Sequence, residues 1–196
     1  PPPPPPPPPP PHFFFNPHAA NPDPLWSRGL GDVYKRQLGR SLYEPDLVDV
    51  ARDLSKSVEV PLPRDVIVST DLSQQAKGEV KQVDEVGTDE MILDIGPVTA
   101  REWAKVLNEA KTILWNGPIG VFEYDQFGEG TRVLAEAVAE SPAFSLAGGG
   151  DTVSAIKNAN AEDGFDYISN AGGAFLEWLE GNQSPGVIAL RENKLS

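Results

Sequence analysis

The chain has 196 residues and a formal net charge of -13, with 21 prolines, two histidines and no cysteine. This acidic balance argues against a nucleic-acid partner, because affinity for a phosphate backbone comes largely from lysine and arginine. The absence of cysteine excludes disulfides and thiolate chemistry and fits a cytoplasmic protein. Both histidines, His12 and His18, precede the globular part, which therefore has no imidazole for general-base catalysis.

Residues 1–37 form a proline-rich opening that begins with eleven consecutive prolines and shows no sustained periodicity. We interpret it as a non-native or disordered segment and exclude it from the fold. Its alternative reading is a docking tail that recruits proline-binding partner domains to an α/β scaffold. No stretch of eighteen apolar residues is present, so no membrane association is expected.

The body, residues 38–196, begins with a helical pattern in which Leu47, Val50, Ala51 and Leu54 share one face. A strand is predicted at 66–68. The polar stretch 70–90 fits either a hairpin or a surface loop. A buried strand at 91–95 and a helix follow, and Thr99 with Glu102 matches a capping box at the start of that helix.

The remaining body alternates between strand and helix. Strands are predicted at 112–115, 144–147 and 167–169, and helices at 131–139, 152–158 and 173–179. Such alternation implies right-handed crossovers and a three-layer α/β fold with a parallel sheet, an incomplete Rossmann-like nucleotide-binding domain. Ligands of such sheets bind at the carboxyl ends of the strands.

Glycine-rich turns follow all three of these strands. Their sequences are Asn116-Gly117-Pro118-Ile119-Gly120, Gly148-Gly149-Gly150-Asp151-Thr152 and Asn170-Ala171-Gly172-Gly173-Ala174. Glycine lets a ligand approach the backbone, and a helix that starts directly afterwards offers free N–H groups to an anion. Close packing of a helix on a strand also demands glycine, so each turn alone fits a structural role equally well.

Three kinds of side chain near these turns allow two readings each. Asp151 is either a helix cap or a magnesium ligand beside phosphates. Glu123 is either a solvated strand-end residue or a partner of ribose hydroxyls. The tryptophans Trp103, Trp115 and Trp178 fit the core better than base stacking.

Six segments of the body resemble, in order and spacing, the carboxy-terminal half of the phosphoglycerate kinase family. They read LGRSLYEPDLVDVA, ILDIGP, TILWNGPIGVFE, AGGGDT, YISNAGGAFLEWLEG and PGVIAL. The resemblance extends from about Leu38 to Leu190, and WNGP-GVFE together with GGGDT is a highly specific combination. It implies that residues 38–196 are part of the carboxy-terminal, nucleotide-binding domain of such a kinase.

The family's reaction is the magnesium-dependent, reversible transfer of a phosphoryl group between 1,3-bisphosphoglycerate and ADP in glycolysis. The resemblance implies the following site: Asn116 and Gly117 border the adenosine, Glu123 holds the ribose, Gly148, Gly149, Gly150 and Thr152 meet the phosphates of ADP or ATP, Asp151 binds Mg²⁺, and Gly172 and Gly173 stabilise the transferring phosphoryl group. A monomer is expected.

Two departures from the family pattern limit what this chain is expected to do. It reads Ser169-Asn170-Ala171-Gly172-Gly173-Ala174 where the family usually has Ser-Thr-Gly-Gly-Gly-Ala. The family's amino-terminal lobe, which binds most of the phosphoglycerate, has no counterpart, and neither does the phosphate-binding lysine. We therefore expect the chain alone to be catalytically inactive.

Overall fold

The computed structural model describes residues 39–41, 48–169, 181 and 188–189. Its helices and strands are α2 (Val48–Ser57), β1 (Asp65–Ser69), β2 (Glu79–Gln82), β3 (Met91–Ile95), α3 (Pro97–Glu109), β4 (Thr112–Asn116), α4 (Glu129–Glu140), β5 (Phe144–Gly148), α5 (Gly150–Asn158) and β6 (Tyr167–Ser169). Three short 3-10 helices, η3 (Val83–Glu85), η4 (Asp125–Phe127) and η5 (Glu162–Gly164), lie in the connections. The predicted α/β class is confirmed, while the helix predicted at 173–179 lies outside the described residues.

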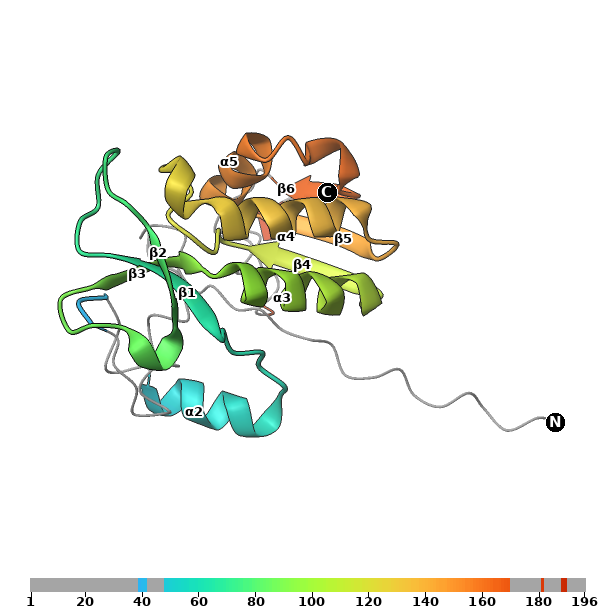
Figure 1. Ribbon diagram of the computed structural model, residues 1–196. Helices are drawn as coiled ribbons and strands as arrows, with labels where there is room; N and C mark the ends of the chain where they lie inside the picture. Colours follow the sequence, from blue (N-terminus) through green and yellow to red (C-terminus); the bar gives the residue numbers. More distant parts are fainter. Residues whose placement is uncertain (1–38, 42–47, 170–180, 182–187, 190–196) are drawn as a thin grey trace.

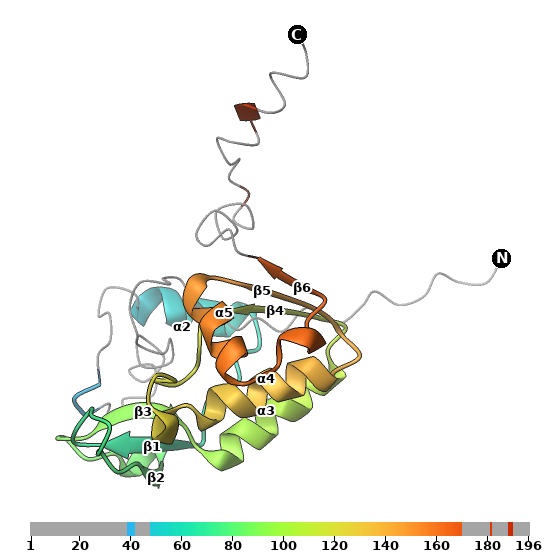
Figure 2. The same cartoon turned by 90° about the horizontal axis from the view of Figure 1, so that it is seen from above.

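The strands β4, β5 and β6 form a parallel sheet in that order, as the strand–helix alternation predicts. Successive right-handed crossovers in one direction place their helices on the same face. Accordingly, α4 and α5 lie with α3 on one side of this sheet (Figures 1 and 2). The opposite side carries more exposed apolar residues, among them Leu114, Phe144 and Tyr167.

The strands β1 and β3 do not belong to the parallel sheet, contrary to the expectation of a single one. They form a separate antiparallel sheet in the order β2-β1-β3. The physical reason is the connections: no helix of crossover length separates these three strands, and parallel neighbours need such a crossover. The polar stretch 70–90 thus contains one arm of a hairpin, β2 paired with β1, and not only a surface loop.

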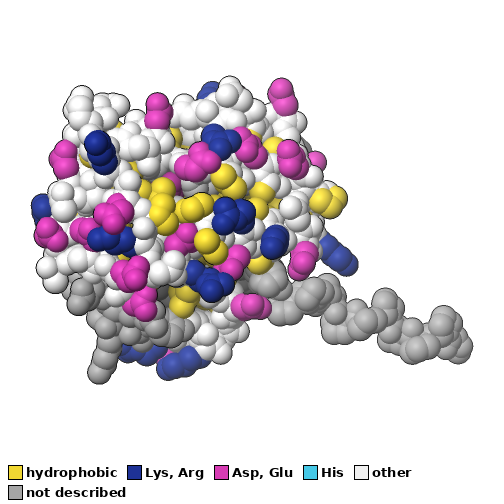
Figure 3. Space-filling model, in the orientation of Figure 1, with side chains coloured by type: hydrophobic (Ala, Val, Ile, Leu, Met, Phe, Trp, Pro, Cys, Tyr) yellow, Lys and Arg dark blue, Asp and Glu magenta, His cyan; other side chains and the backbone are white. Residues whose placement is uncertain are grey.

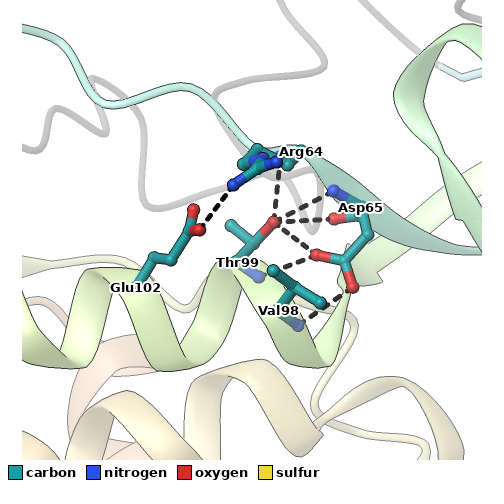
Figure 4. Close-up of polar contacts among 5 residues, drawn as sticks. All are labelled: Arg64, Asp65, Val98, Thr99 and Glu102. Atoms are coloured by element: carbon teal, nitrogen blue, oxygen red, sulfur yellow. Dashed lines mark hydrogen bonds and ion pairs between the residues drawn. The ribbon is translucent and has the colours of Figure 1, made fainter.

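The start of α3 differs from the predicted capping box. The helix begins at Pro97 after Gly96, and no side chain of its own caps it. Instead, the carboxylate of Asp65 in β1 accepts hydrogen bonds from the backbone N–H of Val98, at 2.9 Å, and of Thr99, at 2.7 Å (Figure 4). The helix is thus capped by Asp65 of β1 and not by a residue of its own first turn, because the chain folds back and places β1 against this helix end.

Thr99 and Glu102, the two residues of the predicted capping box, make other contacts. The Thr99 hydroxyl is fully buried and accepts hydrogen bonds from the N–H groups of Arg64 and Asp65. Glu102 forms an ion pair with the Arg64 side chain at 2.8 Å (Figure 4). Both residues thus fasten α3 to the start of β1 rather than to the helix's own first turn.

The main hydrophobic core lies between the parallel sheet and its helices and extends to strands β1 and β3 of the antiparallel sheet. Trp103 of α3, Trp115 of β4, and Leu134 and Val138 of α4 are all buried in it. The Trp115 and Phe165 rings pack with their centroids 6.1 Å apart. The assignment of Trp103 and Trp115 to the core is confirmed, and Trp178 lies outside the described residues.

The surface over α3 and α4 carries acidic and basic side chains that are interspersed (Figure 3). Arg132 of α4, for example, forms ion pairs with both Glu129 and Glu136 on the same helix. Among the described residues, no helix is long and apolar enough to cross a membrane.

Candidate functional site

The carboxyl ends of the three parallel strands lie side by side. In the sheet register Asn116 is opposite Gly148, and Gly148 is opposite Ser169. The glycine-rich turns after β4 and β5 therefore leave the same sheet edge, as predicted. The third turn, with Gly172 and Gly173, lies outside the described residues.

The turn after β5 leads directly into α5. Gly149 has φ +99°, a left-handed conformation that favours glycine, and it precedes the helix without a side-chain cap. A Cβ added at Gly150, the first residue of α5, would meet no atom of a described residue within 4 Å. No described side chain caps the first N–H groups of α5, and such groups with the positive end of the helix dipole attract anions.

Asp151 is the second residue of α5 and is half-buried. Its carboxylate forms no hydrogen bond or ion pair with another described residue, so it does not cap its own helix. Across the described part of the chain, no group of three or more Asp, Glu, His or Cys side chains could hold a metal ion. A cation here would therefore need oxygen ligands from a bound molecule in addition to Asp151.

Thr152, the third residue of α5, links the two turns. Its side chain is buried, and its Oγ1 accepts a hydrogen bond from the Gly117 N–H at 2.5 Å. The Gly117 carbonyl accepts a hydrogen bond from the Trp115 indole N–H at 2.5 Å, and Gly117 itself has φ +97°. In this arrangement the threonine oxygen binds the protein itself and fixes the turn after β4.

Glu123 lies further along the chain from β4, in a turn, and is exposed. Its carboxylate has no hydrogen-bond or ion-pair partner within the described ranges, which leaves it available to a ligand or to water. The structure therefore brings Asn116, Gly117 and Thr152 together, whereas no hydrogen bond or ion pair between described residues joins Glu123 to them.

Asp94, the acid of this region whose pKa is shifted most, was not predicted as a site residue. Asp94 of β3 is fully buried, and this burial raises its pKa to about 7. Its carboxylate accepts hydrogen bonds at 2.8 Å from the N–H groups of Ile95 and of Gly130, the second residue of α4. The only local signal is an aspartate inside an otherwise apolar strand.

Thr131, the third residue of α4, was also missed. It is buried, and its Oγ1 accepts hydrogen bonds from the Ile119 N–H at 3.0 Å and the Gly120 N–H at 3.1 Å. Nothing in the local sequence indicates these contacts, because the bonded residues lie 11 and 12 positions earlier.

Comparison with known proteins shows which family this chain is similar to. The model of the family described as phosphoglycerate kinase matches residues 31–182. Phosphoglycerate kinase from Coxiella burnetii is 45% identical with a TM-score of 0.77, over 82% of this chain and 43% of that one. Phosphoglycerate kinase from Pyrococcus horikoshii is 32% identical with a TM-score of 0.66, over 74% of this chain and 36% of that one.

The chain therefore spans less than half the length of either of these relatives. The family match nevertheless covers both described turns, the helices α3 to α5 and the whole parallel sheet. The chain belongs to the phosphoglycerate kinase family.

Proposed function

We propose that this chain is the carboxy-terminal, nucleotide-binding part of a phosphoglycerate kinase. The complete protein would transfer a phosphoryl group reversibly from the acyl phosphate of 1,3-bisphosphoglycerate to ADP, giving 3-phosphoglycerate and ATP in glycolysis. The observation that carries the proposal is the N-terminus of α5, which no described side chain caps and which lies at the sheet edge where two glycine turns meet, with Gly150 exposed.

The nucleotide would lie across this edge. In our proposal Gly148, Gly149 and Gly150 offer backbone N–H groups to the phosphates. Asn116 and Gly117 border the adenosine, and Glu123 binds the ribose. The left-handed backbone of Gly117 and Gly149 supports this assignment, because a side chain there would strain the turn that approaches the ligand.

Thr152 would act beside the phosphates in two ways. Its oxygen accepts the Gly117 N–H, so it holds the adenosine-side turn next to the phosphate-side helix. Its hydroxyl hydrogen is left to donate to a phosphate oxygen. Gly172 and Gly173, at the next predicted helix start, would face the phosphoryl group that is transferred.

The residues present fit a magnesium–nucleotide complex. Asp151 supplies one carboxylate with no other described partner, and Mg²⁺ in kinases is typically held by one or two carboxylates plus phosphate oxygens. A bound Mg²⁺ would neutralise phosphate charge during transfer. Without a cation, the negative charge of Asp151 would repel the phosphates.

We propose that phosphoryl transfer to or from a carboxyl group requires residues that this chain does not supply. The chain matches only 43% and 36% of the two relatives, and the phosphoglycerate would bind mainly to the remaining lobe. We therefore propose that residues 38–196 form a partial domain, that residues 1–37 stand outside it, and that the chain alone is a cytoplasmic monomer without turnover. A coupled assay of the purified chain tests this, and measurable turnover would contradict it.

The nucleotide site is tested by calorimetric titration of Mg-ADP into the full chain and two variants. Asp151→Ala removes the proposed metal ligand, whereas Asp163→Ala removes the same charge from an exposed residue of η5 and serves as the control. We expect binding by the unmodified chain, a loss of about tenfold or more in Asp151→Ala, and no change in Asp163→Ala. Equal affinity in both variants, or no binding by a folded unmodified chain, would contradict the proposal.

A further inference from the structure

Residues 117–123 form the first part of the connection between β4 and α4 and are named the β4–α4 loop. Hydrogen bonds to three other residues hold it in place. The Gly117 N–H binds Thr152, the Ile119 and Gly120 N–H groups bind Thr131, and the Val121 N–H binds the Leu93 carbonyl at 2.9 Å. Two of these three anchors are threonine hydroxyls at helix starts, so the loop's conformation depends on side chains and not only on backbone pairing.

The anchor at α4 has a second, buried component. The Asp94 carboxylate accepts the Gly130 N–H, one residue before Thr131, and so fixes the helix start from which Thr131 projects. The same carboxylate lies directly against the loop, because a Cβ added at Gly120 would come within 2.4 Å of Asp94 Oδ1. Asp94 and Thr131 therefore form one structural unit with the middle of the β4–α4 loop.

The chain contains a second copy of this unit at α3. Thr99 is likewise the third residue of its helix and buried, and its Oγ1 also accepts two backbone N–H groups. Asp65 caps α3 from a strand as Asp94 caps α4. The two copies differ in what they hold: Thr99 fastens residues 64 and 65 at the start of β1, whereas Thr131 fastens a loop.

We propose that Thr131 and Asp94 are positioning residues for nucleotide binding, which act by holding the β4–α4 loop in its binding conformation. The inference rests on the function proposed above, because Asn116, Gly117 and Glu123, at the two ends of this loop, are the residues assigned to the nucleoside. A loop pinned at its middle keeps these ends in a fixed relation, and the ligand then does not have to order the loop on binding.

The test compares three variants of the full chain. Thr131→Val keeps the shape of the side chain and removes its hydroxyl, Thr131→Ser restores the hydroxyl, and Thr99→Val removes the equivalent hydroxyl at α3. Two properties are measured: hydrogen exchange of the Ile119 and Gly120 amides, and the Kd for Mg-ADP.

We expect faster exchange of both amides and a Kd raised about tenfold in Thr131→Val, with both properties returned close to their original values in Thr131→Ser. Thr99→Val should lower the stability of the chain by a similar amount and leave the Kd unchanged. If Thr131→Val does not fold, the pair Thr131→Ser and Thr131→Ala isolates the same hydroxyl.

The outcomes separate the inference from the proposed function. Failure of the unmodified chain to bind Mg-ADP contradicts the proposed function, whatever the variants do. Binding that persists at the same Kd in Thr131→Val, or that weakens equally in Thr99→Val, overturns the inference while the nucleotide site stands.

Discussion

The carboxylate of Asp65 and the hydroxyl of Thr99 are joined by a hydrogen bond of 2.6 Å in the interior between β1 and α3 (Figure 4). Burial alone would raise the pKa of Asp65, but the Thr99 hydroxyl and the N–H groups of Val98 and Thr99 outweigh it and hold that pKa below its usual value. The charged carboxylate is thus the form that the fold stabilises, and it caps α3 at the positive end of the helix dipole.

Removing this cap should destabilise the chain strongly. Asp65→Ala leaves the N–H groups of Val98 and Thr99 without their acceptor, and we expect a loss of about 2–4 kcal/mol in the free energy of unfolding. Urea denaturation at pH 7 measures it, with Asp163→Ala as the exposed control. A loss below about 0.5 kcal/mol, the size typical of surface substitutions, would show that water or another group replaces the carboxylate.

The Asp65 contribution should also depend on pH in a defined direction. A depressed folded pKa stabilises the chain above the ordinary pKa of 3.8, and this stabilisation is lost as the pH falls through the lower folded value. The stability difference between the unmodified chain and Asp65→Asn should therefore be constant above about pH 5 and shrink in stronger acid. A difference that grows on acidification would contradict the assignment.

Asp94 should show the opposite behaviour. Its folded pKa is raised from 3.8 to about 7 by burial, so the folded state binds more protons than the unfolded state between these values. Stability from this group therefore falls as the pH rises from about 4 to about 7, and it levels off above. Because the Asp94→Asn variant carries an amide that does not titrate, the stability of the unmodified chain relative to this variant should fall across that window in urea denaturation. A flat difference would show that Asp94 is charged throughout.

Two glycines, Gly120 in the β4–α4 loop and Gly150 at the start of α5, should respond differently to alanine. At Gly120 an added Cβ would lie 2.2 Å from the Phe127 carbonyl oxygen and 2.4 Å from Asp94, and both groups are fixed. We expect Gly120→Ala to cost about 1–3 kcal/mol or more. At Gly150 an added Cβ would meet no described atom within 4 Å, so Gly150→Ala should leave stability unchanged or raise it by about 0.5 kcal/mol, while any bound phosphate would meet the new methyl group.

Thermal or urea unfolding of Gly120→Ala and Gly150→Ala measures their difference in stability. Titration of Gly150→Ala with Mg-ADP measures the effect of the added methyl group on nucleotide binding. The order of stabilities is the critical result. If Gly150→Ala were the less stable of the two, the space above the start of α5 would be filled by some other part of the protein, and the anion site proposed there would be lost.

Local patterns in the sequence predicted the strands of the parallel sheet well, because each is a short apolar run between helices that carry clear apolar faces. β2 was harder to predict: three of its four residues are exposed, so burial imposes little alternation on its sequence. Its pairing with β1, and hence the antiparallel sheet, could not be predicted from that segment alone.

The contacts that shape the candidate site were largely invisible in the sequence for a different reason. The hydrogen bond from Gly117 to Thr152 spans 35 residues and that from Gly130 to Asp94 spans 36. The local capping-box rule predicted that Thr99 caps α3. A Thr-x-x-Glu pattern matches this rule even where, as here, the helix begins before the threonine. Glycine-rich turns located the sheet edge, but only the fold shows which side chains hold those turns.

The hydrogen bond from the Gly117 N–H to Thr152 links the two described turns. Thr152→Val keeps the size of the buried side chain but removes the acceptor of the Gly117 N–H, and we expect a loss of about 1–3 kcal/mol and faster hydrogen exchange of that amide. Thr152→Ser should preserve slow exchange, because it keeps the oxygen. The Trp115 indole still binds the Gly117 carbonyl in both variants, so the turn should loosen without unfolding. Unchanged exchange of the Gly117 amide in Thr152→Val would mean that another group protects it, and Thr152 would then be free to serve a ligand alone.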